Sequence, residues 1–225
     1  MNSAAWPGSI RDAKAIQAEL RGRVKIIPLN KAPRFIAAVD AAFSGEHVIG
    51  AVCVYRYPSL VLTEEAYAVA RVYLPYIPGY LSFREGPAII ETLKKLKTDP
   101  DIILFDGQGI AHPQGLGIAS HIGVILDKPT IGCAKSRLVG EYAEPGMHKG
   151  EWSLLQYNKK IIGVVLRTKD KVKPVFISPG HRIDLPSSIE IILGCTGKYR
   201  IPDPLRRADI LSKEMKRKRE AVKGY

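Results

Sequence analysis

Three apolar runs, separated by short turns, follow one another in the first third of the chain. They span residues 34–43, 47–57 and 60–74, and the turns between them contain Ser-Gly-Glu and Pro-Ser. Apolar runs of this length, rich in Val and Tyr and bounded by turn residues, are typical of adjacent β-strands. The pattern therefore predicts an antiparallel three-strand meander.

The rest of the chain alternates short strand patterns with helical patterns. Segment 101–106 is short, β-branched and apolar, which is typical of a buried parallel strand, and 129–134 reads as another short strand. A further hairpin and strand are predicted at 152–158, 161–169 and 172–178.

Helical patterns lie between and around these strands. They cover 9–24, with Ser9 as N-cap, then 81–97, 115–127, 185–195 and 203–220. Pro87 lies inside the second pattern and predicts a kink or a restart there. We therefore expect one α/β domain over residues 1–225, with a mixed sheet flanked by helices and a basic helical end at about 204–225.

The charge balance narrows the class of partner. Lys and Arg total 34 against 22 Asp and Glu, a net charge of +12. This favours a polyanion, mainly nucleic acid, over a basic surface kept only for solubility.

The cysteines and the apolar runs exclude other classes. Cys53, Cys133 and Cys195 are widely spaced and form no C-x-x-C motif, so neither a zinc knuckle nor a disulfide framework is expected. No apolar run reaches membrane-spanning length, and the N-terminus lacks a secretory pattern. The sequence predicts a reduced, cytoplasmic protein.

Two acids stand where strands should be apolar. Asp40 interrupts the first run, and Asp106 ends segment 101–106. A carboxylate in or at the end of a buried strand is costly unless it is paired or bound to a metal. Asp106, followed by Gly-Gln-Gly, also fits a turn. Two such acids on neighbouring strands favour a site for Mg²⁺, or for Mn²⁺ in its place, because oxygen ligands without a Cys/His cluster suit these ions.

Two further acids are weaker candidates. Glu85 lies near the core border of its predicted helix, although, taken alone, a surface pair with Arg84 or Lys94 is the better explanation. Asp209 lies near the start of the last helix, where stabilisation of the helix dipole is the simpler explanation.

Two basic side chains are candidates for phosphate or proton chemistry. Lys135 follows a predicted strand and can reach a phosphate, or it is one more solvated lysine. His112 lies in the Gly-rich loop after Asp106 and can contact phosphate or assist proton transfer. We interpret His121 and His181 as structural histidines.

The segment PYIP forms a stiff apolar tip. Tyr76 and Ile77 lie between Pro75 and Pro78, whose rings fix φ. A rigid, partly buried turn explains the prolines but leaves an exposed Tyr-Ile pair unexplained.

Carboxylates and Mg²⁺ in a basic protein indicate phosphodiester hydrolysis. The alternative from another class is a nucleic-acid-binding module without catalysis. The intact set of Asp40, Glu85, Asp106 and Lys135 argues against that alternative.

The motifs AVD, PYIPGYLSFREGP, FDGQGIAHP, GIASHIG, IGCAKSRL, RTK, ISPGH and RRAD, in this order, resemble the endonuclease V family of deoxyinosine nucleases over about residues 10–218. The resemblance implies an RNase H-like fold and an Mg²⁺-dependent DNA repair enzyme that acts on deaminated bases, chiefly hypoxanthine. We expect the protein to be a monomer. It also implies hydrolysis of the second phosphodiester bond 3′ to the lesion, leaving 3′-hydroxyl and 5′-phosphate ends. Action on inosine in RNA stays open as the alternative.

The resemblance also implies residue roles. Asp40 and Asp106 match the metal-binding acids, and Glu85 matches the third acid. Lys135 matches the lysine near the scissile phosphate, and His112 the loop histidine. Asp209 occupies a position that is His or Asp in the family. The segment AVDAAF departs from the commoner form, which has a hydroxyl residue after the Asp.

The PYIP segment resembles the family's wedge, inserted where the damaged base leaves the helix. Rotating a base out of the stack costs a few kcal/mol, and an aromatic ring that fills the gap recovers about 1–3 kcal/mol. We expect the extruded base to enter a pocket made by loop backbones and two apolar walls. Its residues are Gly79, Leu81, Gly107, Gly117 and Ile118.

Overall fold

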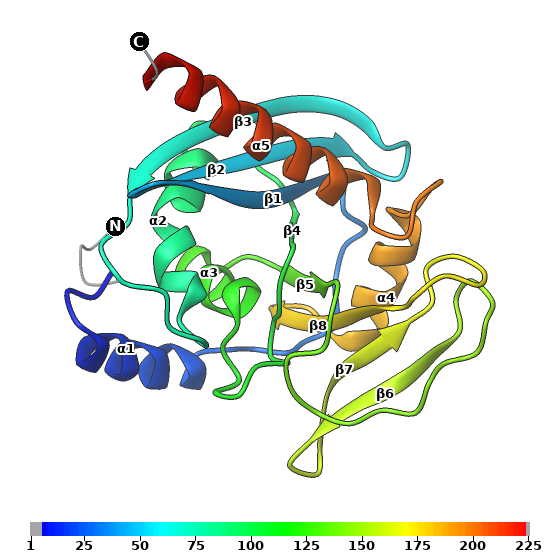
Figure 1. The fold of residues 1–225 in the computed structure, drawn as a ribbon. Coiled ribbons are helices and arrows are strands. Elements are labelled where there is room, and N and C mark those ends of the chain that lie inside the picture. The colour runs from blue at the N-terminus through cyan, green and yellow to red at the C-terminus, as the bar shows by residue number, and fades with distance from the viewer. Residues whose placement is uncertain (1–5, 224–225) are drawn as a thin grey trace.

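One eight-stranded mixed sheet runs through the molecule, with helices on both faces (Figure 1). The computed structural model describes residues 6–223. The strand order is β3-β2-β1-β4-β5-β8-β7-β6. The strands are β1 Phe35–Ser44, β2 His47–Arg56, β3 Val61–Arg71, β4 Ile102–Phe105, β5 Thr130–Ala134, β6 Trp152–Tyr157, β7 Lys160–Leu166 and β8 Val175–His181. The helices are α1 Ile10–Gly22, α2 Leu81–Leu93, α3 Ile118–Leu126, α4 Leu185–Gly194 and α5 Asp203–Lys223.

The strand pairing confirms the predicted meander. β1, β2 and β3 are antiparallel neighbours, and β3 ends at Arg71 rather than at residue 74. β4 is parallel to both β1 and β5. β8 is antiparallel to β5, and the β6–β7 hairpin continues the sheet beyond it. The carboxyl ends of β1, β4 and β5 therefore lie at one edge of the sheet.

Helix α2 differs from its prediction at both Pro87 and its end. One helix continues through Pro87 instead of restarting there, and it ends at Leu93 rather than at residue 97. Ala88, Ile89 and Ile90 are buried just after the proline. Burial of this stretch against the sheet outweighs the hydrogen bond that Pro87 cannot donate.

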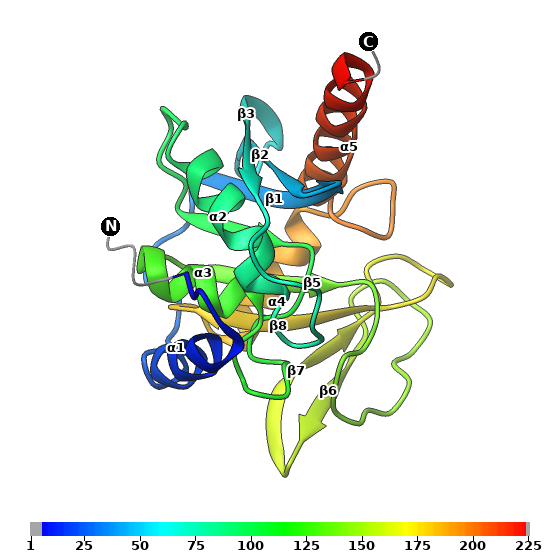
Figure 2. The same ribbon diagram turned by 60° about the vertical axis from the view of Figure 1, so that its left-hand side comes forward.

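Alternation along the strands gives the sheet two cores. Ile36 and Ile102 belong to the cluster that α4 and α5 cover, whereas Ala37 and Ile103 belong to the cluster that α2 and α3 cover. Figure 2 shows α2 and α5 on opposite sides of the meander. A strand residue of even number in β1 or β4 therefore faces α4 and α5.

Cys53, Cys133 and Cys195 are free and buried. Within residues 6–223, none of the helices has the length and apolar character that a membrane span requires.

Candidate active site

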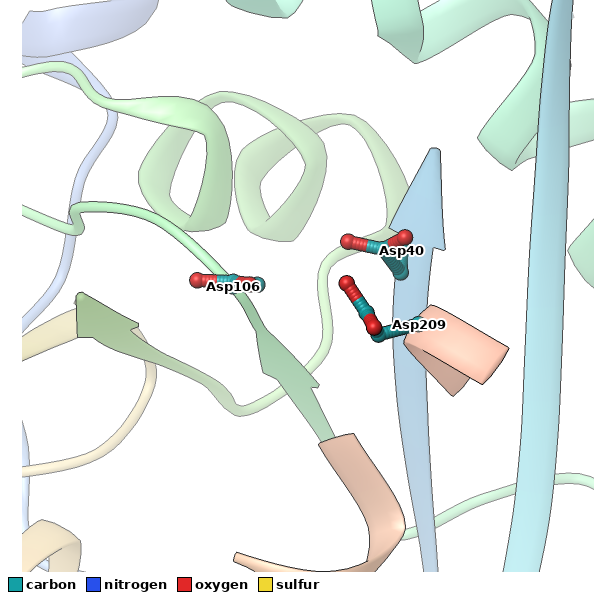
Figure 3. Close-up of side chains that lie close together, drawn as sticks. All are labelled: Asp40, Asp106 and Asp209. Carbon is teal, nitrogen blue, oxygen red and sulfur yellow. The ribbon is translucent and has the colours of Figure 1, made fainter. Parts of the chain in front are cut away.

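Three aspartates meet at the carboxyl edge of the sheet (Figure 3). One carboxylate oxygen from each of Asp40, Asp106 and Asp209 lies within 4.8 Å of the other two. Val39 pairs with Phe105, so the next residues, Asp40 and Asp106, come level on adjacent parallel strands. Both have even numbers and project toward α5, which supplies Asp209. Strand alternation and register thus assemble the cluster.

Asp40 is the one aspartate of this cluster whose carboxylate has no hydrogen bond from a lysine within residues 6–223. Burial raises its pKa to about 6, and the charges of Asp106 and Asp209 add to that rise. The Ser212 hydroxyl opposes the rise by donating a hydrogen bond of 2.6 Å to Asp40 Oδ2. The same hydroxyl lies 3.0 Å from the Asp209 carbonyl oxygen, so Ser212 ties β1 to α5.

The other two aspartates have cationic partners. Lys135 Nζ donates to Asp106 Oδ2, and Lys213 Nζ lies 2.7 Å from Asp209 Oδ2. Burial lowers the pKa of the Lys135 ammonium, but the hydrogen bond and charge of Asp106 outweigh burial and raise it above its ordinary value. Lys135 is therefore charged at neutral pH and held at the acid cluster.

Glu85 lies beside this cluster rather than within it. Burial raises the pKa of its carboxyl to about 8; Asp40 and Asp106 add to the rise, and Arg84 opposes it. Among the described residues, the acids whose oxygens gather within metal-binding distance are the three aspartates without Glu85. Asp209, which the sequence explains simply by stabilisation of the helix dipole, holds the third place. A role for Glu85 as a metal ligand stays a prediction.

The donor set fits a hard divalent cation. It consists of three partly buried carboxylates with no His or Cys among them. Mg²⁺ and Mn²⁺ prefer such oxygen ligands, and a cation there would offset both the burial and the mutual repulsion that raise the pKa of Asp40.

A cavity of about 390 Å³ opens beside Asp106 and Lys135. All five predicted pocket residues line it: Gly79, Leu81, Gly107, Gly117 and Ile118. Tyr76, Ile77 and Pro78 of the wedge also line it, and so does His112. Segments far apart in the sequence therefore form one pocket next to the acids.

Different structural constraints favour glycine at the three glycine positions of the pocket. Gly79 has a positive φ of 85°. A Cβ on Gly117 would lie 2.3 Å from the Gln108 carbonyl oxygen, and one on Gly107 would lie 2.8 Å from Ile118. Packing within the loop therefore requires Gly107 and Gly117. A bulky residue at position 117 would test the loop rather than base recognition.

Gln108 is a pocket residue that the sequence did not single out. Its side chain is 8% exposed and lines the cavity. Nε2 donates to the Ser136 carbonyl oxygen at 3.1 Å, which leaves Oε1 as a buried acceptor without a partner. A buried acceptor left unpaired is costly, so its position in a cavity indicates a donor on the ligand.

The wedge is held from behind by an arginine. Tyr76 is 66% exposed, whereas Ile77 is half-buried, so the expected exposed pair is a single exposed ring. The Arg84 guanidinium carbon lies 5.6 Å from the centre of the Tyr76 ring and 4.5 Å from that of Phe43. Arg84 thus bridges the wedge to β1.

Two contacts converge on the backbone just after the wedge. Gln17 Nε2 of α1 donates to the Gly79 carbonyl oxygen at 3.1 Å. Burial lowers the pKa of His112 to about 4, and a hydrogen bond with Gly79 opposes the shift. His112 is neutral near pH 7 and links its loop to the wedge. Its predicted role in phosphate contact or proton transfer stays a prediction.

His121 and His181 have the structural environments expected of them. His121 Nδ1 lies 2.8 Å from the Ser82 hydroxyl, and the ring packs against Phe83. His181 is buried, with Nε2 3.1 Å from Asp127 Oδ1.

Other supporting residues escaped the sequence analysis. Ser212 lies three residues after Asp209, on the same side of α5, and this spacing is the signal that could have found it. Gln17 and Phe43 carry no such signal, because their partners are distant in sequence.

Three aspartates, on β1, directly after β4 and on α5, cluster beside a lysine that follows β5. This arrangement defines a metal-dependent nuclease with an RNase H-like fold. The Endonuclease V family model matches residues 18–210. The chain belongs to this family and is an endonuclease of DNA repair.

Similar proteins support this assignment over nearly the whole chain. An Endonuclease V of Dictyoglomus turgidum is 49% identical over 93% of this chain and 92% of that protein. The crystal structure of the Streptomyces avermitilis Endonuclease V superposes with a TM-score of 0.91 at 40% identity, covering 97% of both chains. A Ciona intestinalis Endonuclease V, at 28% identity and a TM-score of 0.81 over 93% of this chain and 97% of that one, was crystallised with a DNA 23-mer containing an inosine followed by a ribo-adenosine.

Proposed function

We propose that the protein recognises hypoxanthine in DNA and hydrolyses the second phosphodiester bond on its 3′ side, leaving 3′-hydroxyl and 5′-phosphate ends. The observation that carries this proposal is the unpaired Gln108 Oε1 in a cavity beside the acid cluster. The inosine-containing DNA bound by the Ciona relative supports it.

Gln108 supplies the discrimination that the proposal needs. Hypoxanthine carries a proton on N1, whereas N1 of adenine is an acceptor. Gln108 Oε1 therefore pairs with the N1–H of hypoxanthine and faces a lone pair on adenine. A buried group built to hydrogen-bond a substrate rejects the analogue that lacks the partner by much more than an apolar pocket does.

The wedge makes the base available to this pocket. Extruding a nucleotide leaves a gap in the stack, and the exposed Tyr76 ring can fill it. Pro75 and Pro78 limit the entropy lost on docking, and Arg84 supports the ring from behind. Recognition thus combines a stacking ring with a hydrogen-bonding pocket.

We propose that Asp40, Asp106 and Asp209 hold Mg²⁺, with Mn²⁺ as a substitute, and that Glu85 completes the acidic site. Bound there, the cation would polarise the scissile phosphate and offset its charge. Lys135, charged and fixed by Asp106, places a further positive charge where the phosphate and the leaving oxygen need it. Ser212 keeps Asp40 oriented toward α5.

A cleavage panel tests the proposed function. It compares hypoxanthine, uracil, abasic and adenine substrates in DNA and in RNA, single- and double-stranded, with and without Mg²⁺. We expect Mg²⁺-dependent nicking of deoxyinosine DNA well above every other DNA substrate. Faster cutting of inosine in RNA would favour the alternative, an inosine-specific endoribonuclease, which the ribo-adenosine in the Ciona complex keeps in view.

We also propose that the protein acts as a monomer in the cytoplasm. Its three free, buried cysteines suit a reducing compartment.

A further inference from the structure

Three loops beside the active site carry a group of cationic side chains that have no part in the proposed catalysis. The loops are residues 145–151, 167–174 and 196–202, and the last leads into α5. With the first turn of α5 they present seven cations, which we call the basic loop surface: Lys149, Lys169, Lys171, Lys173, Lys198, Arg200 and Arg206. Within the described part of the chain, none of the seven forms an ion pair with a carboxylate.

These cations outnumber the acids of the same loops, which are Glu151, Asp170 and Asp203. Two of these acids are engaged by the backbone, since Glu151 accepts from the His148 N–H and Asp170 from the Lys149 N–H. The surface therefore keeps a net positive charge directed at solvent.

The loops are held in fixed positions. Arg167 is 3% exposed, and its guanidinium donates to the carbonyl oxygens of Gly146 and Pro145 at 2.8 and 2.9 Å. The Thr168 hydroxyl donates to the Arg200 carbonyl oxygen at 2.6 Å, and Lys169 Nζ to that of Lys198 at 2.8 Å. These bonds join the three loops, so the cations project from loop backbones that are held in place.

One cation is fixed by an aromatic ring. The Arg206 guanidinium carbon lies 3.5 Å from the centre of the Tyr199 ring, which is itself 45% exposed. Arg206 is three residues before Asp209 on α5. The basic loop surface therefore reaches within one helical turn of the acid cluster.

Strand pairing places the loops at the same edge of the sheet as the acids. Leu166 pairs with Val175, and Ala134 pairs with Phe176, so the 167–174 loop leaves the sheet next to Lys135. Figure 1 shows the 167–174 loop, in yellow, and the 196–202 segment, in orange, on the side of α4. The cations of the 167–174 loop, Lys135 and the aspartates thus lie along the same edge of the sheet.

The pocket and the basic loop surface lie on opposite sides of that edge. The pocket is built from the start of α2, the start of α3 and the loops after β4 and β5. The 196–202 loop connects α4 to α5, which cover the other face. The aspartates lie between the two regions.

We propose that the basic loop surface binds the phosphates of the cleaved strand on the 3′ side of the cut. This inference rests on the proposed function, in which the base enters the pocket and the cut follows on its 3′ side. A strand with its lesion in the pocket and its scissile bond at the aspartates runs 3′-ward onto these loops. Regularly spaced phosphates are the ligand that several fixed, unpaired cations select.

The test compares two double variants in which two lysines are replaced by glutamine, so that each loses two positive charges. Both carry Asp106→Asn, which prevents cleavage. The test pair is Lys173→Gln with Lys198→Gln. The control pair is Lys25→Gln with Lys31→Gln, two exposed lysines near the opposite edge of the sheet, around Asp127 and Arg182. Binding to deoxyinosine DNA is measured by fluorescence anisotropy over a range of salt concentrations. One DNA has long arms on both sides, one ends just past the scissile bond, and one has a shortened 5′ arm.

We expect the test pair to weaken binding of the long DNA roughly tenfold and to reduce the salt slope by about 1–2, since each lost phosphate contact removes about 0.9. The DNA with the short 3′ arm should bind both variant pairs equally, whereas the DNA with the short 5′ arm should keep the full difference. Equal losses in the two pairs, or a difference that follows the 5′ arm, overturn the proposal.

Failure of the proposed function gives a separate result. Wild-type protein that does not nick the long deoxyinosine duplex in Mg²⁺ refutes the proposed function. Normal nicking together with affinity that ignores the 3′ arm refutes only the role of the basic loop surface.

Discussion

The acid cluster and the recognition pocket occupy neighbouring positions but are built in different ways. Asp40 and Asp106 project from paired strands, and Ser212 and Lys135 hold their carboxylates. The wedge is a loop, and the pocket joins loops to the starts of α2 and α3; near Gly79 they are held by single side chains such as Gln17. Chemistry needs atoms fixed to a fraction of an ångström, whereas recognition must let a base enter. We therefore expect damage to one region to leave the other largely intact.

The largest effect is expected at Asp106. Asp106→Asn removes one cluster ligand and the partner of Lys135, so single-turnover nicking of deoxyinosine DNA in Mg²⁺ should fall at least about a thousandfold, ~4 kcal/mol. Affinity for the same DNA should change little. Nicking at the wild-type rate would contradict a metal mechanism.

Gln108 should control which base is cut. Gln108→Leu keeps the size of the side chain but removes the acceptor, so cleavage of deoxyinosine DNA should fall by about 10–100-fold. Cleavage at adenine should not fall, so the ratio of the two rates is the readout. Gln114→Leu, the same change at an exposed glutamine of the same loop that does not line the pocket, is the matched control. An unchanged ratio in the leucine variant would show that Oε1 does not read the base.

Tyr76 should affect binding more than chemistry. Tyr76→Ala removes a stacking contact of about 1–3 kcal/mol, which corresponds to roughly 5–150-fold weaker binding and faster release of nicked product. The single-turnover rate at saturating enzyme should change much less. Tyr73→Ala is a suitable control, because Tyr73 is 80% exposed and does not line the pocket. Equal losses in both variants would argue against a wedge.

Ser212 should affect the metal site without touching DNA. Ser212→Ala frees the Asp40 carboxylate, and the loss of such a supporting bond should weaken Mg²⁺ binding about tenfold. The shift of the melting temperature on titration with Mg²⁺, without DNA, measures this. Ser187→Ala, at the far end of α4, provides a matched control. An unchanged titration would limit Ser212 to helix packing.

The smallest effect is the pH dependence of metal stabilisation. The folded protein holds protons on Asp40 up to a pKa of about 6 and on Glu85 up to about 8, above their ordinary values of 3.8 and 4.5. Between pH 3.8 and about 6 for Asp40, and between pH 4.5 and about 8 for Glu85, the folded state binds more protons than the unfolded state. Raising the pH through these windows therefore lowers the stability of the metal-free protein. Mg²⁺ replaces the protons, and its stabilisation should be larger at pH 8 than at pH 5 by about 1–3 kcal/mol. Equal stabilisation at both values would mean that neither group titrates this way.

The same contrast explains what the sequence could predict. Asp40 and Asp106 were visible because an acid inside an apolar strand pattern is costly, and the meander and the parallel β4 followed from periodicity. Asp209 was weak in the sequence because α5 brings it to β1 from 169 residues away, a contact that no local pattern encodes. The family resemblance points to Glu85 as the third acid, whereas the structure places Glu85 beside the cluster and Asp209 within it.

The residues of the recognition pocket are harder to predict from the sequence than the acids, and the reason is physical. Glycines and prolines marked the loops, but whether a loop side chain has a hydrogen-bond partner depends on its neighbours in space. Gln108 looks like an ordinary polar loop residue until Ser136 occupies its amide and leaves Oε1 unpaired. The kink or restart predicted at Pro87 is wrong for a similar reason: burial of the following turn, which depends on neighbours in space, lets α2 continue.

The central claim is that a base read in the pocket directs cleavage at the aspartates on its 3′ side. The most direct test maps the ends produced by the wild-type protein in Mg²⁺ on a deoxyinosine duplex and on the same duplex with adenine at that position. We expect one nick in the deoxyinosine strand, at the second phosphodiester bond 3′ to the lesion, with 3′-hydroxyl and 5′-phosphate ends. Nicks at another position, or equal cutting of the adenine duplex, would contradict it.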